Sequence, residues 1–106
     1  MYILVVYIPE EHLERVKDAL FDAGAGDFGS YDRCGWHVKG TGQFRPLEGS
    51  DPYLGSAGTV ERVSEYRFEV TCRDEVAEDV LDALFDAHPY EVPAYHLFRA
   101  LTREEL

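Results

Sequence analysis

The chain has 106 residues and a formal net charge of −11, from 21 acidic and 10 basic side chains. This length fits a single domain, residues 1–106, with one hydrophobic core. The negative charge argues against a nucleic-acid partner and against an anionic membrane surface, because both attract positively charged protein faces. No apolar stretch approaches the roughly 20 residues of a membrane span. No signal peptide is visible, so a cytoplasmic location is expected.

The first predicted element is a buried strand over Tyr2–Ile8, a continuous apolar run rich in β-branched and aromatic residues. A helix over Glu11–Ala23 follows, because Pro9 suits a helix start and apolar residues recur at i, i+3 and i+4. Glycines end this helix. A second strand is predicted at roughly Ser30–Val38.

The second half of the chain repeats the first. Glu75–Ala87 copies Glu11–Ala23 at a constant offset of 64 residues, with nine of thirteen positions identical. The same offset aligns the alternating segment Tyr66–Cys72 with the first strand, which predicts a further strand there. A last strand is predicted at roughly Ala94–Ala100. The order βαββαβ predicts a ferredoxin-like α+β sandwich: a four-stranded antiparallel sheet with both helices on one face and the first and third strands at its centre.

The first strand carries apolar side chains on both of its faces. Alternation along the strand places Ile3, Val5 and Tyr7 on the side away from the helices. An uncovered apolar sheet face is sticky in water. A second copy of the same sheet is the simplest cover, so we expect a homo-oligomer.

A long loop is predicted between the two inner strands, at about residues 39–61. Its sequence, KGTGQFRPLEGSDPYLGSAGTVE, is far longer than an ordinary hairpin loop. Three interpretations remain open. The loop is an ordered excursion, or it binds an anion through the backbone N–H groups of Gly40 and Gly42 and the guanidinium of Arg45, or it binds a protein partner. No nucleotide-binding glycine motif is present.

The histidines and cysteines match no standard metal or catalytic motif. The two cysteines are expected to be reduced thiols, and Cys34 and His37, three apart on a strand, should face opposite sides. His88 ends the second helix and opens the segment His-Pro-Tyr-Glu-Val-Pro. It either interacts with the helix dipole or, with Glu91 and with Cys34 or His37 of a neighbouring subunit, holds a metal ion. No complete catalytic set is recognisable, so we expect no enzyme activity.

Two sequence segments resemble known families. GTGQFRPLEG at Gly40–Gly49 and HPYEVPAY at His88–Tyr95 resemble the domain inserted in YqfO-type members of the NIF-three-like dinuclear-metal proteins. HPYEVP alone also resembles the CutA-like divalent-cation-tolerance proteins. The resemblance runs from Tyr2 to about Phe98, and it implies a CutA-like, PII-like fold and assembly as a trimer. The flanking domain that holds two metals in those proteins has no counterpart here, so the chain looks like a stand-alone version.

The resulting hypothesis is a non-enzymatic oligomeric binding or regulatory module of unknown ligand. The alternative is a divalent-metal-binding protein for copper or zinc, which would make a metal ion the one cofactor to expect. The predicted ligand-binding residues are Arg45, Gly40, Gly42 and Tyr90, and the predicted metal ligands are His88, Glu91, Cys34 and His37. The site is expected where the long loop meets the HPYEVP segment, between subunits.

Overall fold

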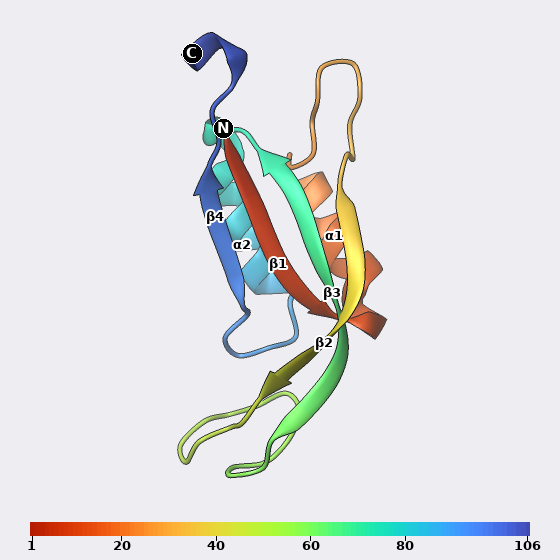
Figure 1. Ribbon diagram of the computed structural model, residues 1–106, viewed down its shortest axis with the longest axis vertical. Coiled ribbons are helices and arrows are strands. Elements are labelled where there is room, and N and C mark those ends of the chain that lie inside the picture. The colour runs from red at the N-terminus through yellow and green to blue at the C-terminus, as the bar shows by residue number, and fades with distance from the viewer.

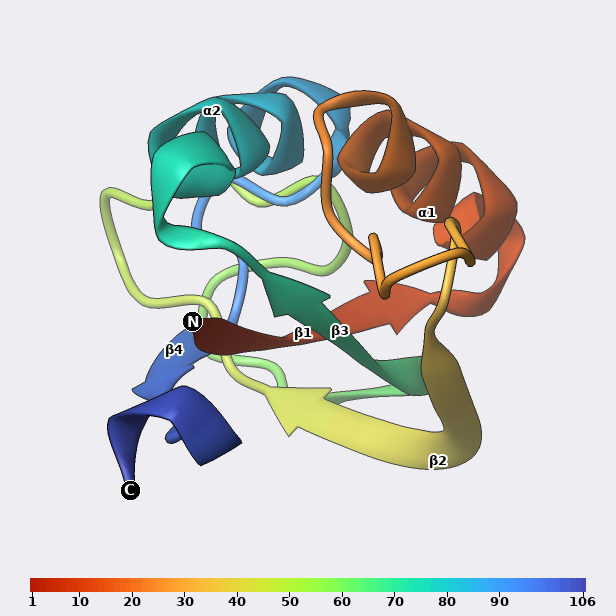
Figure 2. The ribbon, with the colours of Figure 1, turned by 90° about the horizontal axis from the view of Figure 1, so that it is seen from above.

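A computed structural model describes the protein over residues 1–106. The four strands and two helices are β1 (Tyr2–Pro9), α1 (Leu13–Asp22), β2 (Trp36–Phe44), β3 (Glu61–Cys72), α2 (Ala77–Ala87) and β4 (Tyr95–Arg99). The strands form one antiparallel sheet in the order β2-β3-β1-β4. Both helices cover the same face of this sheet (Figures 1 and 2). The predicted ferredoxin-like α+β arrangement is confirmed.

The two repeats share the same order of elements: a strand, a short 3-10 helix and an α-helix. A short 3-10 helix precedes each α-helix, at Glu10–His12 and at Asp74–Val76, so the α-helices begin slightly later than predicted. The core between sheet and helices takes apolar side chains from both repeats, because each helix presents one apolar stripe to the sheet. Its fully buried members include Leu4, Val6, Ile8, Leu20, Phe68, Val80 and Leu84.

The second strand and the long loop differ from the prediction. β2 spans Trp36–Phe44 rather than Ser30–Val38, and β3 begins at Glu61, so the loop is reduced to Arg45–Val60. The glycine-rich start of the predicted loop is a strand because it pairs in register with β3 from Trp36↔Glu69 to Phe44↔Glu61. Backbone pairing along a long partner strand outweighs the low strand propensity of glycine. The β2–β3 arm therefore extends past the helices (Figure 1).

The sheet face away from the helices is partly apolar, as the alternation in β1 predicts. Val5 is buried on this face by its strand neighbours, whereas Trp36, Val38 and Phe98 are 55%, 45% and 54% exposed. Cross-strand pairing places Trp36, Glu69 and Val5 in one row, which confirms that they share a face. We call Trp36, Val38, Phe98 and Val5 the outer patch. The structure contains no helix long and apolar enough to cross a membrane.

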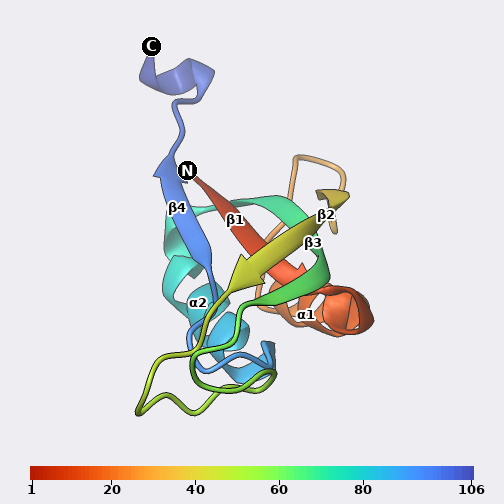
Figure 3. The same ribbon diagram turned by 60° about the horizontal axis from the view of Figure 1, so that its bottom comes forward.

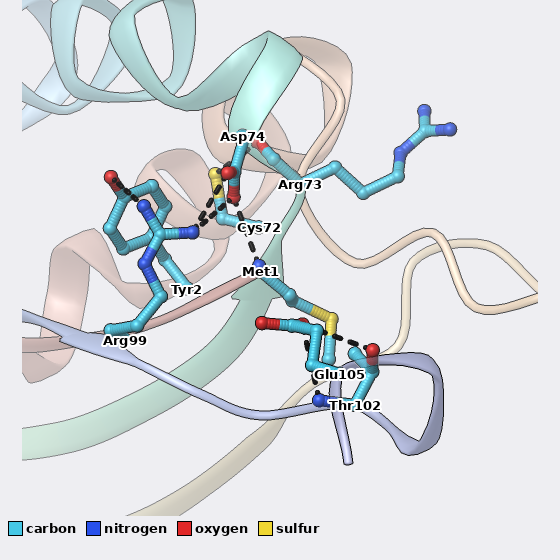
Figure 4. Close-up of polar contacts among 8 residues, drawn as sticks. All are labelled: Met1, Tyr2, Cys72, Arg73, Asp74, Arg99, Thr102 and Glu105. Atoms are coloured by element: carbon cyan, nitrogen blue, oxygen red, sulfur yellow. Dashed lines mark hydrogen bonds and ion pairs between the residues drawn. The ribbon is translucent and has the colours of Figure 1, made fainter.

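Arg99 joins the two ends of the chain. Its Nη1 donates to both carboxylate oxygens of Asp74, at 2.9 and 2.7 Å, and its Nη2 donates to the hydroxyl of Tyr2 at 2.7 Å (Figure 4). The guanidinium lies 4.1 Å from the centroid of the Tyr2 ring. The hydrogen bond from Arg99 lowers the pKa of the exposed Asp74 carboxyl. These contacts link β4, β1 and the start of the second helical segment.

Candidate functional site

The Arg45–Val60 loop is largely exposed, but it folds back and contacts other parts of the chain. The hydroxyl of Tyr53 lies 3.0 Å from Nε2 of His12, and the backbone N–H of Asp51 donates to Oε1 of Glu91 at 3.3 Å. The ring centroids of Tyr53 and Tyr90 are 6.2 Å apart. Figure 3 shows the loop beside the segment that joins α2 to β4. The loop and the HPYEVP segment thus meet within one chain, as an ordered contact.

A cavity of about 410 Å³ lies between the loop and this segment. Its lining is mostly aromatic and apolar, with a few polar side chains. This size and this lining are typical of small-molecule sites. The aromatic and charged residues of the lining are Tyr7, Phe44, Arg45, Tyr53, Glu65, Tyr90 and Glu91.

The hydroxyl of Tyr90 is buried and has no hydrogen-bond partner. Burial, helped by the nearby carboxylate of Glu65, raises the pKa of Tyr90 to about 12, so the group is a neutral phenol. A buried hydroxyl without a partner costs free energy, since the water it loses on folding is not replaced. Tyr90 therefore offers an unused polar group beside the cavity.

Glu65 is a second unpaired polar group in the lining. No hydrogen bond or ion pair joins its half-buried carboxylate to a protein cation, and burial raises its pKa. The carboxylate lies against the α-carbon of Gly42, where a Cβ atom would overlap it. Gly42 is thus needed for the position of Glu65, whereas Gly40 faces open space.

His88 holds the HPYEVP segment in place. Its Nε2 donates to the backbone oxygen of Tyr7 at 2.8 Å, and its Nδ1 accepts from the backbone N–H of Tyr90 at 3.1 Å. The side chain is only 5% exposed, and burial lowers the pKa of the imidazole. A neutral ring with both nitrogens engaged satisfies this site. His88 follows the last residue of α2 in extended conformation, so its role is a tie between segments rather than a charge on the helix dipole.

The four predicted metal ligands are not brought together within the chain. Cys34 lies before β2, where its thiol faces the backbone oxygen of Asp32 at 3.6 Å. His37 lies on β2 with its ring centroid 5.2 Å from that of Tyr66. Glu91 is at the cavity, and no group of three or more metal-type side chains converges anywhere in the structure. A shared site that includes a neighbouring subunit stays a prediction.

Of the predicted ligand-binding residues, the structure places Arg45 and Tyr90 at the cavity and places the two glycines elsewhere. Gly40 and Gly42 lie inside β2, paired with Glu65 and Val63. In an extended strand the N–H groups of residues two apart point in the same direction and do not converge on one point, so these glycines do not form the concave amide cradle that the loop prediction implies. Sequence reasoning missed Tyr7 and Glu65, because strand register, not a local motif, delivers them to the cavity.

The topology and the helix-covered sheet define a CutA-like ferredoxin domain. The periplasmic divalent cation tolerance protein CutA from Archaeoglobus fulgidus has the same fold, with a TM-score of 0.68 and 20% identity over 98% of this chain and 90% of that one. No family model matches the chain.

Comparison of sequences shows closer similarity to one segment of longer, NIF3-related proteins. The chain is 50% identical over 94 residues to the GTP cyclohydrolase 1 type 2 homolog of Mycobacterium tuberculosis, which covers 89% of this chain and 25% of that protein. The Bacillus cereus protein related to NIF3 superposes with a TM-score of 0.79 and 40% identity over 92% of this chain and 24% of that one. The chain therefore spans about a quarter of the length of the relatives that it matches. The predicted resemblance to the CutA-like domain within NIF3-related proteins is confirmed.

Proposed function

We propose that this domain is a non-enzymatic binding or regulatory module whose ligand site is the cavity between the Arg45–Val60 loop and the HPYEVP segment. The observation that carries the proposal is the buried, unpaired hydroxyl of Tyr90 beside a cavity of small-molecule size. A ligand that bonds this hydroxyl would remove its desolvation cost. Buried polar groups with no protein partner are uncommon and often have a functional reason.

A thermal-shift screen of small fragments tests the site. A ligand that binds only the folded state raises the stability by RT ln(1 + [L]/Kd), so hits should raise Tm with concentration. Ala94→Trp places a large ring at an exposed residue of the cavity lining and should abolish these shifts. Ala57→Trp, in the same loop but outside the lining, is the matched control. Shifts that survive Ala94→Trp, or a screen without hits, would contradict the proposal.

We do not assign to this domain the reaction that the name of its relatives suggests. The relatives are about four times longer, so their chemistry has room outside the matched segment. The one buried histidine is engaged at both nitrogens and is not available as a base or nucleophile. These observations support a binding role for the domain rather than a catalytic one.

We also propose that the domain forms a homo-oligomer, with a trimer as the expected state. The support is the outer patch, in which Trp36 and Phe98 are more than half exposed. Trp36 lies on β2 and Phe98 on β4, the two edge strands, and the Arg67–Glu69 ion pair of β3 lies between them. Exposed apolar side chains on a sheet face are typical of protein interfaces. Cytoplasmic location, the absence of a nucleic-acid partner and contact of the loop with a protein partner remain predictions.

Divalent copper or zinc binding is the second candidate. The observation in its favour is the fold shared with a protein named for divalent cation tolerance. The engaged nitrogens of His88 weigh against it. Metal analysis of protein purified without an affinity tag separates the candidates: stoichiometric metal that is lost in Glu91→Gln would support a metal site, and metal-free protein would exclude it.

A further inference from the structure

We infer that the cavity selects an organic cation: an amine carried on an aromatic or apolar body. The inference deepens the proposed function and rests on it. The aromatic rings of the cavity, its unpaired acceptors and the exposed position of its one cationic side chain all favour such a ligand.

Four aromatic side chains line the cavity, and two of them pack against the ring of a third. The ring centroid of Tyr90 lies 5.8 Å from that of Phe44 and 6.2 Å from that of Tyr53, and Tyr7 is the fourth aromatic residue of the lining. The face of an aromatic ring is electronegative and attracts cations, and groups of such rings recognise ammonium ligands. The apolar parts of the same rings suit a hydrophobic body.

Two polar groups of the lining, the carboxylate of Glu65 and the hydroxyl of Tyr90, can accept hydrogen bonds and have no donor within the protein. The carboxylate of Glu65 is half-buried without a counter-ion, and the hydroxyl of Tyr90 is buried without a partner. Removing a carboxylate from water without a cation is costly, and an ammonium supplies both the missing charge and several N–H donors. The net charge of −11 adds a general attraction for cations.

Arg45, the one cationic side chain of the lining, does not reverse this preference. It lies on the exposed Arg45–Val60 loop, where water solvates its guanidinium, whereas the carboxylate of Glu65 is half-buried. An anionic ligand at the exposed Arg45 would gain little from an interaction screened by water, and it would meet the charge of Glu65 and of Glu91. The geometry thus favours a cation over the anion that the loop sequence alone suggests.

Three probes of matched shape test the charge preference: 2-phenylethylamine, 2-phenylethanol and 3-phenylpropionate, titrated at millimolar concentrations and followed by protein NMR. The amine is expected to bind at least about tenfold more tightly than the alcohol, and the carboxylate most weakly. Equal or tighter binding of the alcohol or the carboxylate would overturn the cation inference while leaving the cavity as a binding site. If none of the three binds, both the inference and the proposed function fail.

Glu65→Gln tests the assigned partner of the amine. This variant keeps the shape of the side chain and removes its charge, so affinity for the amine should fall about tenfold while affinity for the alcohol is unchanged. Glu78→Gln removes one charge from the exposed part of α2 and should change neither affinity. A loss of affinity in Glu65→Gln that is equal for amine and alcohol would show a purely structural effect and would overturn the inference.

Discussion

Nε2 of the His88 imidazole donates a hydrogen bond to the backbone oxygen of Tyr7 over 2.8 Å. This bond joins the end of β1 to the segment after α2, across most of the chain. Because Nδ1 of the same ring accepts the N–H of Tyr90, His88 also fixes the residue that carries the unpaired hydroxyl. Within the chain, His88 thus holds the HPYEVP segment against β1 and positions the cavity.

Replacing His88 should therefore destabilise the fold itself. We expect His88→Ala to lower the free energy of unfolding by about 2–4 kcal/mol, because it leaves a partly buried oxygen and N–H unpaired and opens a void in place of the buried imidazole. Urea unfolding followed by circular dichroism measures this. His12→Ala, at a residue that is not buried, should cost less than about 1 kcal/mol. Equal small effects of the two variants would contradict the assigned role.

The buried state of His88 also predicts a dependence of stability on pH. Burial holds the pKa of the folded imidazole below the unfolded value of about 6.5, so the unfolded chain binds the proton more readily. The contribution is complete above about pH 6.5 and is lost as pH falls through that value toward the folded pKa. Urea unfolding between about pH 7.5 and pH 5.5 should show a decline in wild type that is smaller in His88→Ala. Identical pH profiles would contradict this.

Removing the Tyr90 hydroxyl should stabilise the free protein. Tyr90→Phe deletes a buried group without a partner, and we expect a gain of about 1 kcal/mol in the free energy of unfolding. Tyr53→Phe, which loses the contact to His12, should not stabilise. Chemical denaturation of both variants tests the pair. A destabilised Tyr90→Phe would mean that the hydroxyl has a partner, and the argument for the ligand site would be lost.

The two glycines of β2 should respond differently to alanine. Gly42→Ala should displace the flexible carboxylate of Glu65 and change the free energy of unfolding by less than about 1 kcal/mol. The displacement should return the raised pKa of Glu65 toward its ordinary value. Gly40→Ala faces open space and should leave this pKa unchanged. Carboxyl ¹³C NMR titration of Glu65 measures both. A change in the pKa of Glu65 in Gly40→Ala but not in Gly42→Ala would contradict the contact between the Glu65 carboxylate and Gly42.

Sequence predicted the fold well because the repeat is local. The match of Glu75–Ala87 to Glu11–Ala23 carries the helix stripe and the strand before it, and together they determine the topology. The second strand was misplaced because glycine-rich Lys39–Gly42 has loop-like composition, and only its pairing with β3 makes it a strand. Local propensity does not contain that information.

The candidate site was predicted only in part, for a related reason. The sequence predicts that the loop and the HPYEVP segment meet between subunits. In the structure they meet within one chain, where Tyr53 of the loop packs near Tyr90 and the backbone N–H of Asp51 bonds Glu91. Tyr7 and Glu65 arrive through strand register and have no motif. A metal ligand at His88 would need a free ring nitrogen, whereas within the chain Nε2 donates to the Tyr7 oxygen and Nδ1 accepts the N–H of Tyr90.

Assembly depends on the outer patch in this account. Trp36→Glu places a charge in its exposed part and should dissociate the oligomer, because burying an unpaired carboxylate at an interface is costly. Leu101→Glu, at an exposed apolar residue near the C-terminus, is the control and should leave the molar mass of the oligomer unchanged. Size-exclusion chromatography with light scattering measures both. A wild-type monomer at all concentrations would contradict the proposed oligomer.

The central claim is that the Arg45–Val60 loop and the HPYEVP segment form one small-molecule site. Amide NMR of the ¹⁵N-labelled protein, titrated with 2-phenylethylamine, tests it most directly because it locates the contact residue by residue. We predict saturable shifts concentrated at Arg45, Tyr53, Glu65 and Tyr90, the residues that line the cavity. Shifts confined to the outer patch, or no shifts at all, would contradict the claim.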